Sequence, residues 1–275
     1  MQKEIQFYFN VQNILSDIDP DILAYNGEEF WMVESTYEYI EFYSIKNELK
    51  NTLIALQLAR GLHNGVYRKS SIIKDGISYR LPYLIHPLMV CRMLIDSHIP
   101  LEHDDLDILL ASALCHDMIE DIDFLNHGKE LYLNYHLDKK VYETVKYVSK
   151  RKDFTKEEEI AHFHEIESHV LALLVKLSDR GNNVEDLYNM KIWKVHEYVE
   201  ETNMYILPMC DYAFKNYPEL EHSIEILKDK IVTLTTTAQV LVDRYNLQEE
   251  EMLKKIDELR KENAKLRKTL KELWK

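Results

Sequence analysis

The stretch ASALCHDMIEDID, residues 111–123, carries both the strongest fold signal and the strongest chemical signal of the chain. The apolar run LLASALC, residues 109–115, overlaps the start of this stretch and predicts a buried helix. His116 and Asp117 follow directly, and Glu120 and Asp121 come one helical turn later, so all four side chains share one side of a helix. Carboxylates at the end of a buried helix require a metal ion, a partner or an opening to water. A solvated helix face is the alternative interpretation.

The composition of the whole chain favours helices. Its 275 residues are 46% apolar and 30% charged, which is enough for one sizeable core. Only six glycines and six prolines interrupt the chain, so long helices fit better than a many-turned β-sandwich. We therefore expect an all-α helical bundle. Apolar spacing predicts helices over 53–62, 88–95, 106–114, 141–148 and 170–177, with loops over 68–82 and 121–128.

Charge and cysteine usage exclude several classes of protein. The formal net charge of −14 repels polyanions, so we expect no nucleic-acid partner. Cys91, Cys115 and Cys210 form no CxxC motif and are odd in number, which argues against a disulfide framework or a thiolate zinc site. The start of the chain lacks the apolar region of a signal peptide, and the apolar run 170–175 is too short to span a bilayer. We expect a cytoplasmic protein without a membrane segment.

Three regions differ in character along the chain. Residues 1–46 are acidic and rich in Tyr, Phe and Trp, and we interpret them as an N-terminal extension packed onto the main body. Residues 47–217 hold the helical bundle and the chemical motifs. Residues 218–275 contain no proline after Pro218 and no glycine, and predict one long helix.

The last region carries a heptad seam. Apolar residues alternate spacings of four and three from Leu220 to Tyr245, slip by one four-residue step, and resume from Met252 to Leu273. Asn263 occupies a core position of the second part, which favours a two-stranded parallel coiled coil. We therefore expect a homodimer through this coiled coil. In the alternative, residues 219–245 pack on their own domain and only the tail is exposed.

Two other segments offer groups that could complete a site with His116 and Asp117. In PYLIHPL, His86 precedes Pro87, which favours the first turn of a helix and places the imidazole at a helix entrance. In VKLSDRGNN, Asp179 follows an apolar run and Asn183 comes four residues later. Taken alone, His86 is typical of a capping or core histidine and Asp179 of a helix cap or turn.

Taken together, these segments resemble the HD-domain hydrolases, and specifically the guanosine tetraphosphate hydrolase domain of the RelA/SpoT family and the small alarmone hydrolases. The resemblance extends over roughly residues 53–215. Its motifs occur in the family's order: HNGVYRKS, PYLIHP, ALCHDMIED, VSKRK, VKLSDRGNN and ETNMYILP.

The resemblance implies a reaction and the residues that carry it. One divalent ion, usually Mn²⁺, would be held by His86, His116, Asp117 and Asp179. A set of imidazoles and carboxylates with open positions suits such an ion. Glu120 and Asp121 would position or deprotonate the attacking water. The ribose 3′-diphosphate of guanosine tetraphosphate or pentaphosphate would then leave as pyrophosphate, giving GDP or GTP.

The resemblance also implies a nucleotide site, from which the chain departs in places. Nucleotide contacts would come from Arg68, Lys69, Ser70 and Asn183. Val66, Asn182 and Asp186 stand where the family has Gln, His and Thr, and the segment between Ser70 and Pro82 is longer than usual. His63 is a rival metal ligand, as in HD proteins outside this family. Alternative functions are a phosphatase for another nucleotide such as NADPH, or a non-catalytic nucleotide-binding or antitoxin-like module.

Overall fold

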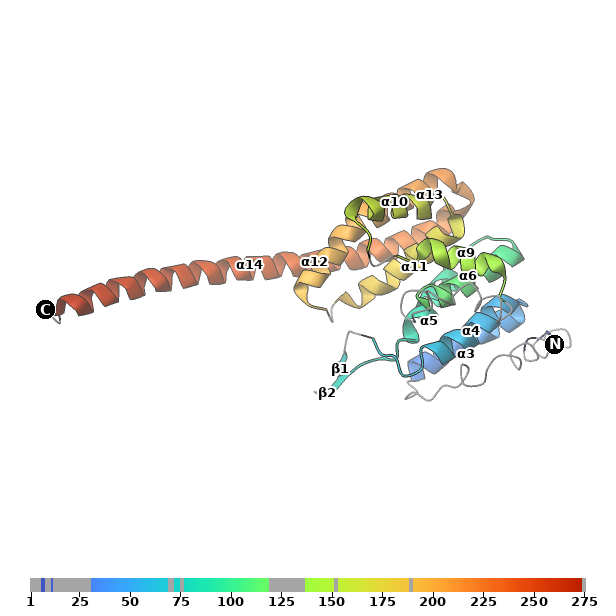
Figure 1. Cartoon of the computed structure of the whole chain (residues 1–275), viewed down its shortest axis with the longest axis horizontal. Coiled ribbons are helices and arrows are strands. Elements are labelled where there is room, and N and C mark those ends of the chain that lie inside the picture. The colour runs from blue at the N-terminus through green and yellow to red at the C-terminus, as the bar shows by residue number, and fades with distance from the viewer. Residues whose placement is uncertain are drawn as a thin grey trace.

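The computed structural model describes residues 6–7, 11, 31–68, 72–74, 77–118, 137–150, 153–187 and 190–273. A compact helical body carries one long helix, α14, that projects from it (Figure 1). The α-helices longer than one turn are α3 (Trp31–Lys46), α4 (Lys50–Leu62), α5 (Ile85–Asp96), α6 (His103–Cys115), α9 (Lys139–Val148), α10 (Lys156–Glu167), α11 (Val170–Glu185), α12 (Ile192–Glu201), α13 (Leu207–Asn216) and α14 (Glu221–Leu273). The predicted all-α fold is confirmed, and each of the five predicted helical stretches lies within one of these helices.

Helices α5, α6 and α11 form the centre of the body. Helix α5 packs against α3, α6 and α11, while α6 also contacts α4 and α9. The last residues of α6, from Asp107 to Cys115, are all buried, as the all-round apolar character of this segment predicts. A Cβ at Gly181 of α11 would lie 2.4 Å from Cε of Met93, the flexible end of an α5 side chain, so a larger residue here would require Met93 to shift.

The segment 68–82, predicted as a loop, contains a short β-hairpin. Strands β1 (Ile72–Lys74) and β2 (Ile77–Tyr79) pair antiparallel with Ile73 opposite Ser78, and Tyr67 bridges to Pro82 at the base. The sequence between the strands is Asp-Gly, which is a strong hairpin signal when apolar residues flank it. The other predicted loop, 121–128, lies outside the described residues.

Helix α3 joins the N-terminal region to the body. Val33, Tyr37 and Ile40 are buried in the main core, and α3 contacts both α4 and α5. Most of residues 1–30 lie outside the described residues. The described part of the aromatic-rich N-terminal region is therefore a core helix.

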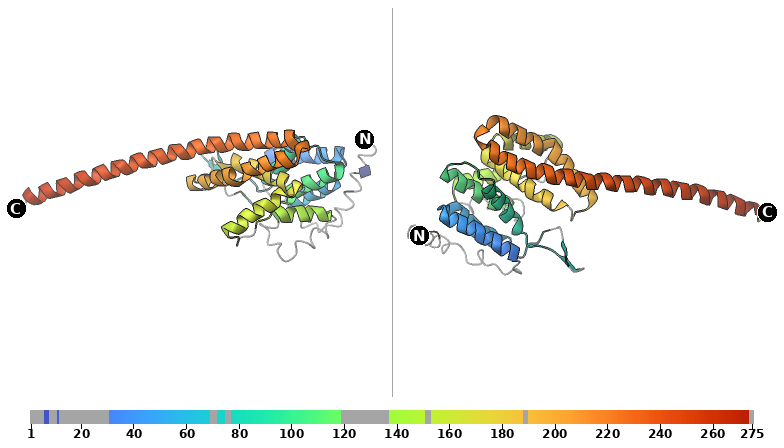
Figure 2. Two further views of the ribbon diagram at one scale, coloured as in Figure 1. Left: turned by 90° about the horizontal axis from the view of Figure 1, so that it is seen from above. Right: turned by 180° about the vertical axis from the view of Figure 1, so that it is seen from behind.

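Helix α14 has two parts with different surroundings. From Ile224 to Val242 its apolar face is buried against α11, α12 and α13 of its own body. From Asp243 to Leu273 every described side chain is exposed, and this tail runs away from the body in all views (Figure 2). The first part of the seam therefore packs on its own body as far as Val242, whereas Tyr245, the last residue of that part, is exposed. None of the helices in the described ranges is long and apolar enough to cross a membrane.

Candidate metal centre

Three helices bring two histidines and a carboxylate together. His86 lies in the first turn of α5, His116 directly follows α6, and Asp179 lies in α11. Nε2 of His86 lies 3.1 Å from Nε2 of His116 and 3.3 Å from Oδ1 of Asp179, and the His116–Asp179 distance is 3.7 Å. All three residues are buried. The main core therefore fixes a compact group of possible metal ligands.

Asp117 adds a second carboxylate to this group. Its Oδ2 lies 3.3 Å from Nε2 of His86 and 3.2 Å from Nε2 of His116. The hydroxyl of Tyr83 donates a hydrogen bond to the same oxygen. The four residues predicted to hold a metal thus lie side by side in the structure.

The outer hydrogen bonds of the two imidazoles determine what their inner nitrogens can do. Nδ1 of His116 lies 2.7 Å from the backbone oxygen of Ala113, which can only accept a hydrogen bond. Nδ1 of His86 lies 2.6 Å from Oδ1 of Asn182, whose amide nitrogen donates to Glu185. Both Nδ1 atoms therefore carry hydrogen, and in the neutral rings both Nε2 atoms present lone pairs to one another and to the carboxylates.

Lone pairs that converge in this way require positive charge between them. Burial alone would lower the pKa of His86 and of His116, yet the carboxylates of Asp117 and Asp179 outweigh burial and raise both. Burial would likewise raise the pKa of the two aspartates, but His116 beside Asp117 and Lys176 beside Asp179 hold them well below the usual range. Either protons or a divalent cation can supply the charge, and the mixed imidazole and carboxylate set fits a divalent metal.

A polar cavity of about 290 Å³ opens onto the group. Two lysines bring positive charge to its wall: Lys176 lies 3.1 Å from Oδ2 of Asp179, and Lys150 pairs with Glu159. The cavity is lined by Tyr83, His86, His116, Asp117, Val148, Lys150, Val175, Lys176, Asp179, Asn183 and Tyr198. The wall of this cavity therefore carries two lysines and two aspartates beside the histidines.

The other predicted site residues are only partly placed. Asn183 lines the cavity and donates a 2.6 Å hydrogen bond to Oδ1 of Asp179. Arg68 is buried and forms a 2.5 Å ion pair with Asp186, and it is not among the residues that line this cavity. The remaining predicted residues, which are Lys69, Ser70, Glu120 and Asp121, lie outside the described residues.

His63, the rival ligand, is buried behind Tyr83. The centroids of the two rings are 4.9 Å apart, and within the described residues neither nitrogen of His63 has a hydrogen-bond partner. Burial lowers the pKa of His63 to about 4, so its ring is neutral at pH 7. In the described part of the chain, the ligand atoms within 4.8 Å of one another come from His86, His116 and Asp179. Neither His63 nor Asp117 belongs to this group, although Asp117 contacts both histidines.

Several residues of the site were not predicted from the sequence. Tyr83, Lys176 and Tyr198 line the cavity, and Asn182 orients His86. Tyr83 lies in the same PYLIHP motif as His86, so its position could have been inferred from that motif. Tyr198 comes from α12, 19 residues after Asp179 in the sequence, and no local pattern marks it.

The fold and the site define an α-helical protein with a buried histidine and carboxylate group that could bind a divalent metal. No family model matches the chain. The chain is 26% identical over 188 residues to the guanosine-3′,5′-bis(diphosphate) 3′-pyrophosphohydrolase of Vibrio cholerae serotype O1. The alignment covers 66% of this chain and 24% of that protein, so the chain spans about a quarter of the length of this distant relative.

Proposed function

We propose that the protein is an HD-type phosphohydrolase that releases pyrophosphate from guanosine tetraphosphate or pentaphosphate and leaves GDP or GTP. The observation that carries the proposal is the convergence of two imidazole nitrogens and the carboxylate of Asp179, with Asp117 beside both histidines, at a cavity whose wall holds two lysines. The distant similarity to a hydrolase with this named reaction supports the choice of substrate. The three cysteines, Cys91, Cys115 and Cys210, are buried thiols, which agrees with a reducing cytoplasm as the site of action.

Four residues would hold the metal: His86, His116, Asp117 and Asp179. A bound Mn²⁺ or similar ion would supply Lewis-acid chemistry and lower the pKa of a water ligand. Tyr83 keeps Asp117 in place through its hydrogen bond, and Asn183 does the same for Asp179. Lys150 and Lys176 bring positive charge to the cavity wall, where an anionic diphosphate would enter.

We propose Glu120 and Asp121 as the groups that position and deprotonate the attacking water, because they follow the metal-binding pair closely in the sequence. Arg68, Lys69 and Ser70 are proposed to contact the nucleotide, with Asn183 near the ribose. Arg68 would act from its ion pair with Asp186, which fixes one edge of the guanidinium. A guanidinium held in this way can still stack on a base.

The test uses the full chain with Mn²⁺, measuring metal content and release of pyrophosphate from guanosine tetraphosphate. His116→Ala and Asp179→Ala should each lose the metal and the activity, whereas His222→Ala, an exposed histidine on α14, should change neither. Glu120→Gln and Asp121→Asn should retain metal while turnover falls by about 10²–10⁴-fold, the usual weight of an acid–base group.

The same assay separates the alternatives. Release of orthophosphate from NADPH with the guanosine nucleotides untouched would replace the proposal with a different phosphatase. Tight binding of guanosine tetraphosphate by metal-loaded protein without any product would replace it with a sequestering module.

A further inference from the structure

The tail of α14 exposes apolar residues that nothing in its own chain covers within the described residues. Between Met252 and Leu273 the seam residues are 40% to 76% exposed: Met252, Ile256, Leu259, Leu266, Leu270 and Leu273. At 1.5 Å per residue this seam is about 32 Å long. A lone helix in water gains nothing from a regular apolar stripe, because most helical stability in proteins comes from packing of such a face.

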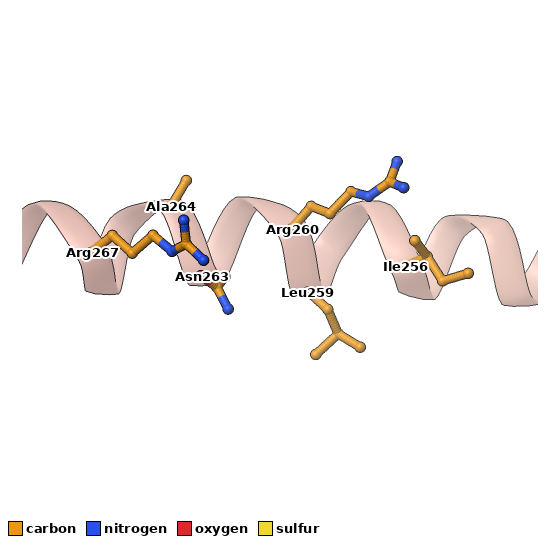
Figure 3. A pocket seen from close by; sticks show the side chains of 6 residues that line it. All are labelled: Ile256, Leu259, Arg260, Asn263, Ala264 and Arg267. Atoms are coloured by element: carbon orange, nitrogen blue, oxygen red, sulfur yellow. The ribbon is translucent and has the colours of Figure 1, made fainter.

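The shape of this face identifies the kind of partner it fits. A shallow pocket on the tail is lined by Ile256, Leu259, Arg260, Asn263, Ala264 and Arg267. Figure 3 shows Leu259 and Asn263 pointing to the same side of the helix. The first four of these residues have the spacing i, i+3, i+4, i+7, which is the four-residue hole that receives one side chain of a facing helix in a coiled coil.

We propose that residues 252–273 pair with the same residues of a second copy in a parallel, in-register, two-stranded coiled coil. Asn263 determines which partner helix fits this face of the tail. In this arrangement it meets Asn263 of the second copy, and the two amides can hydrogen-bond each other. In an antiparallel pair it would face a leucine, leaving a desolvated amide without a partner.

The residues flanking the seam favour the same register. In a parallel pair, Glu262 lies opposite Arg267 of the second copy, and this pair occurs twice. Lys255 lies opposite Arg260 of the second copy, which is repulsive. The tail as a whole carries eight basic and four acidic side chains between 252 and 273, so two tails repel each other at long range. Salt should therefore strengthen the pairing by screening this repulsion.

The pairing must begin after the body ends. Val242 is the last buried residue of α14, and it faces the α12 side of the body. Glu249 follows at the seam position one heptad before Ile256, and in a parallel pair its carboxylate would meet that of Glu249 in the second copy. Their repulsion separates the two helices N-terminal to Met252, which leaves room for the two bodies.

The first experiment measures the mass of the full chain by light scattering at micromolar concentration. The expected mass is twice that of one chain, and raising the salt concentration should increase the dimeric fraction. Leu259→Asp should return the mass to one chain, while Lys261→Asp, on the outer face, should not. A wild-type monomer, or loss of the dimer on adding salt, would overturn the proposal; the latter would indicate an electrostatic partner.

The second experiment determines orientation by disulfide formation. The three native cysteines are buried, so added cysteines report on the tail. Leu266→Cys should form a dimeric disulfide with itself under mild oxidation, and Lys268→Cys, pointing outward, should not. If Met252→Cys instead links to Leu270→Cys in a mixture of the two variants while Leu266→Cys stays reduced, the tails are antiparallel and the proposed arrangement is wrong.

Discussion

Asn182 determines which nitrogen of His86 faces the metal centre. Its Oδ1 accepts from Nδ1 of His86, and its own amide is held by Glu185. Groups that orient a metal-binding histidine contribute strongly to metal affinity although they do not touch the ion. The side-chain oxygen of Asn182 therefore fixes the tautomer of His86, as the backbone oxygen of Ala113 does for His116.

Replacing Asn182 tests this role. Asn182→Ala should lower Mn²⁺ affinity by about 10- to 100-fold, because His86 is then free to turn or to take the other tautomer. Calorimetric titration of the purified variant measures the change. Asn216→Ala, whose side chain bonds only the backbone oxygen of Tyr212 among the described contacts, serves as the control and should bind metal normally. Unchanged affinity in Asn182→Ala would contradict the assigned tautomer.

His63 gives the protein a specific sensitivity to acid. The pKa of a histidine in an unfolded chain is about 6.5, whereas burial lowers that of His63 to about 4 in the fold. The unfolded chain therefore takes up a proton first as the pH falls, and stability is lost between these two values. The full loss amounts to roughly 3 kcal/mol.

His63→Phe should remove the loss of stability that protonation of His63 causes. The free energy of unfolding of this variant should therefore fall less steeply than that of the wild type from pH 6.5 to pH 4. Because neither ring nitrogen of His63 has a hydrogen-bond partner in the described structure, phenylalanine loses no bond there. Urea unfolding across the pH range provides the measurement, with His222→Phe as the exposed control. Parallel pH profiles for His63→Phe and wild type would show that the histidine is not held neutral.

The residues that come together in the candidate metal centre could be predicted from the sequence, but their geometry could not. Adjacent His116 and Asp117 after a buried helix, and His86 before a proline, are local patterns. The tautomers depend on Asn182 and on the oxygen of Ala113, which are set by packing between helices. The pairing of Arg68 with Asp186 joins residues more than a hundred positions apart, so no local pattern indicates it.

At the scale of elements, strong periodicity predicted helices well and irregular segments poorly. The five helices expected between residues 53 and 177 are present because their apolar faces have no other way to be buried. The hairpin β1–β2 was missed although Asp-Gly stood between Ile72–Lys74 and Ile77–Tyr79, two short segments rich in isoleucine and tyrosine. The π-helical turn Thr202–Ile206 between α12 and α13 has no sequence signal, since it depends on how those two helices meet.

Helix α4 begins on a carboxylate supplied by another helix. Asp107 of α6 accepts from the backbone nitrogens of Asn51 and Thr52 at 2.9 and 2.8 Å, and also from both of their side chains. A buried carboxylate at a helix N-terminus satisfies free N–H groups and interacts favourably with the helix dipole. This contact fixes α4 against α6, the helix that leads into His116.

Asp107→Asn should therefore destabilise the fold by about 1.5–3 kcal/mol, the range for hydrogen bonds to a charged group. The amide retains one acceptor oxygen but places an NH₂ group where the other oxygen accepted. Chemical denaturation measures the effect. Asp105→Asn on the same helix removes only an exposed ion pair with Lys140 and should cost less than about 1 kcal/mol. Equal losses of stability in the two variants would show that the contact of Asp107 with the start of α4 stabilises the fold no more than an exposed ion pair does.

At the scale of the whole molecule, α14 connects the exposed tail with the wall of the cavity. A small core separate from the main one holds Val184, Leu187, Val195, Val199, Ala238 and Val242. Tyr198, which lines the cavity, packs against this small core from α12. Arg180 also ties α12 to α11 through its ion pair with Glu201 and lies 4.9 Å from the ring of Tyr198. The position of the cavity wall therefore depends on the buried part of α14.

This arrangement predicts a loss of stability for one change on α14 and almost none for a change two residues away. Val242→Ala removes apolar contact from the small core and should cost about 1–2 kcal/mol of stability, since buried methyl groups contribute roughly 0.8 kcal/mol each before any cavity cost. Val240→Ala, at a side chain that is 60% exposed, should be nearly neutral. Urea unfolding of both variants gives these values, and substrate titration should show a raised KM for Val242→Ala alone, because Tyr198 loses its support.

Deleting 246–275 should leave the stability and KM of the body unchanged, since no described side chain beyond Val242 is buried. If that deletion shifts KM as Val242→Ala does, the tail itself acts on the cavity, and the small core is not what holds the wall in place.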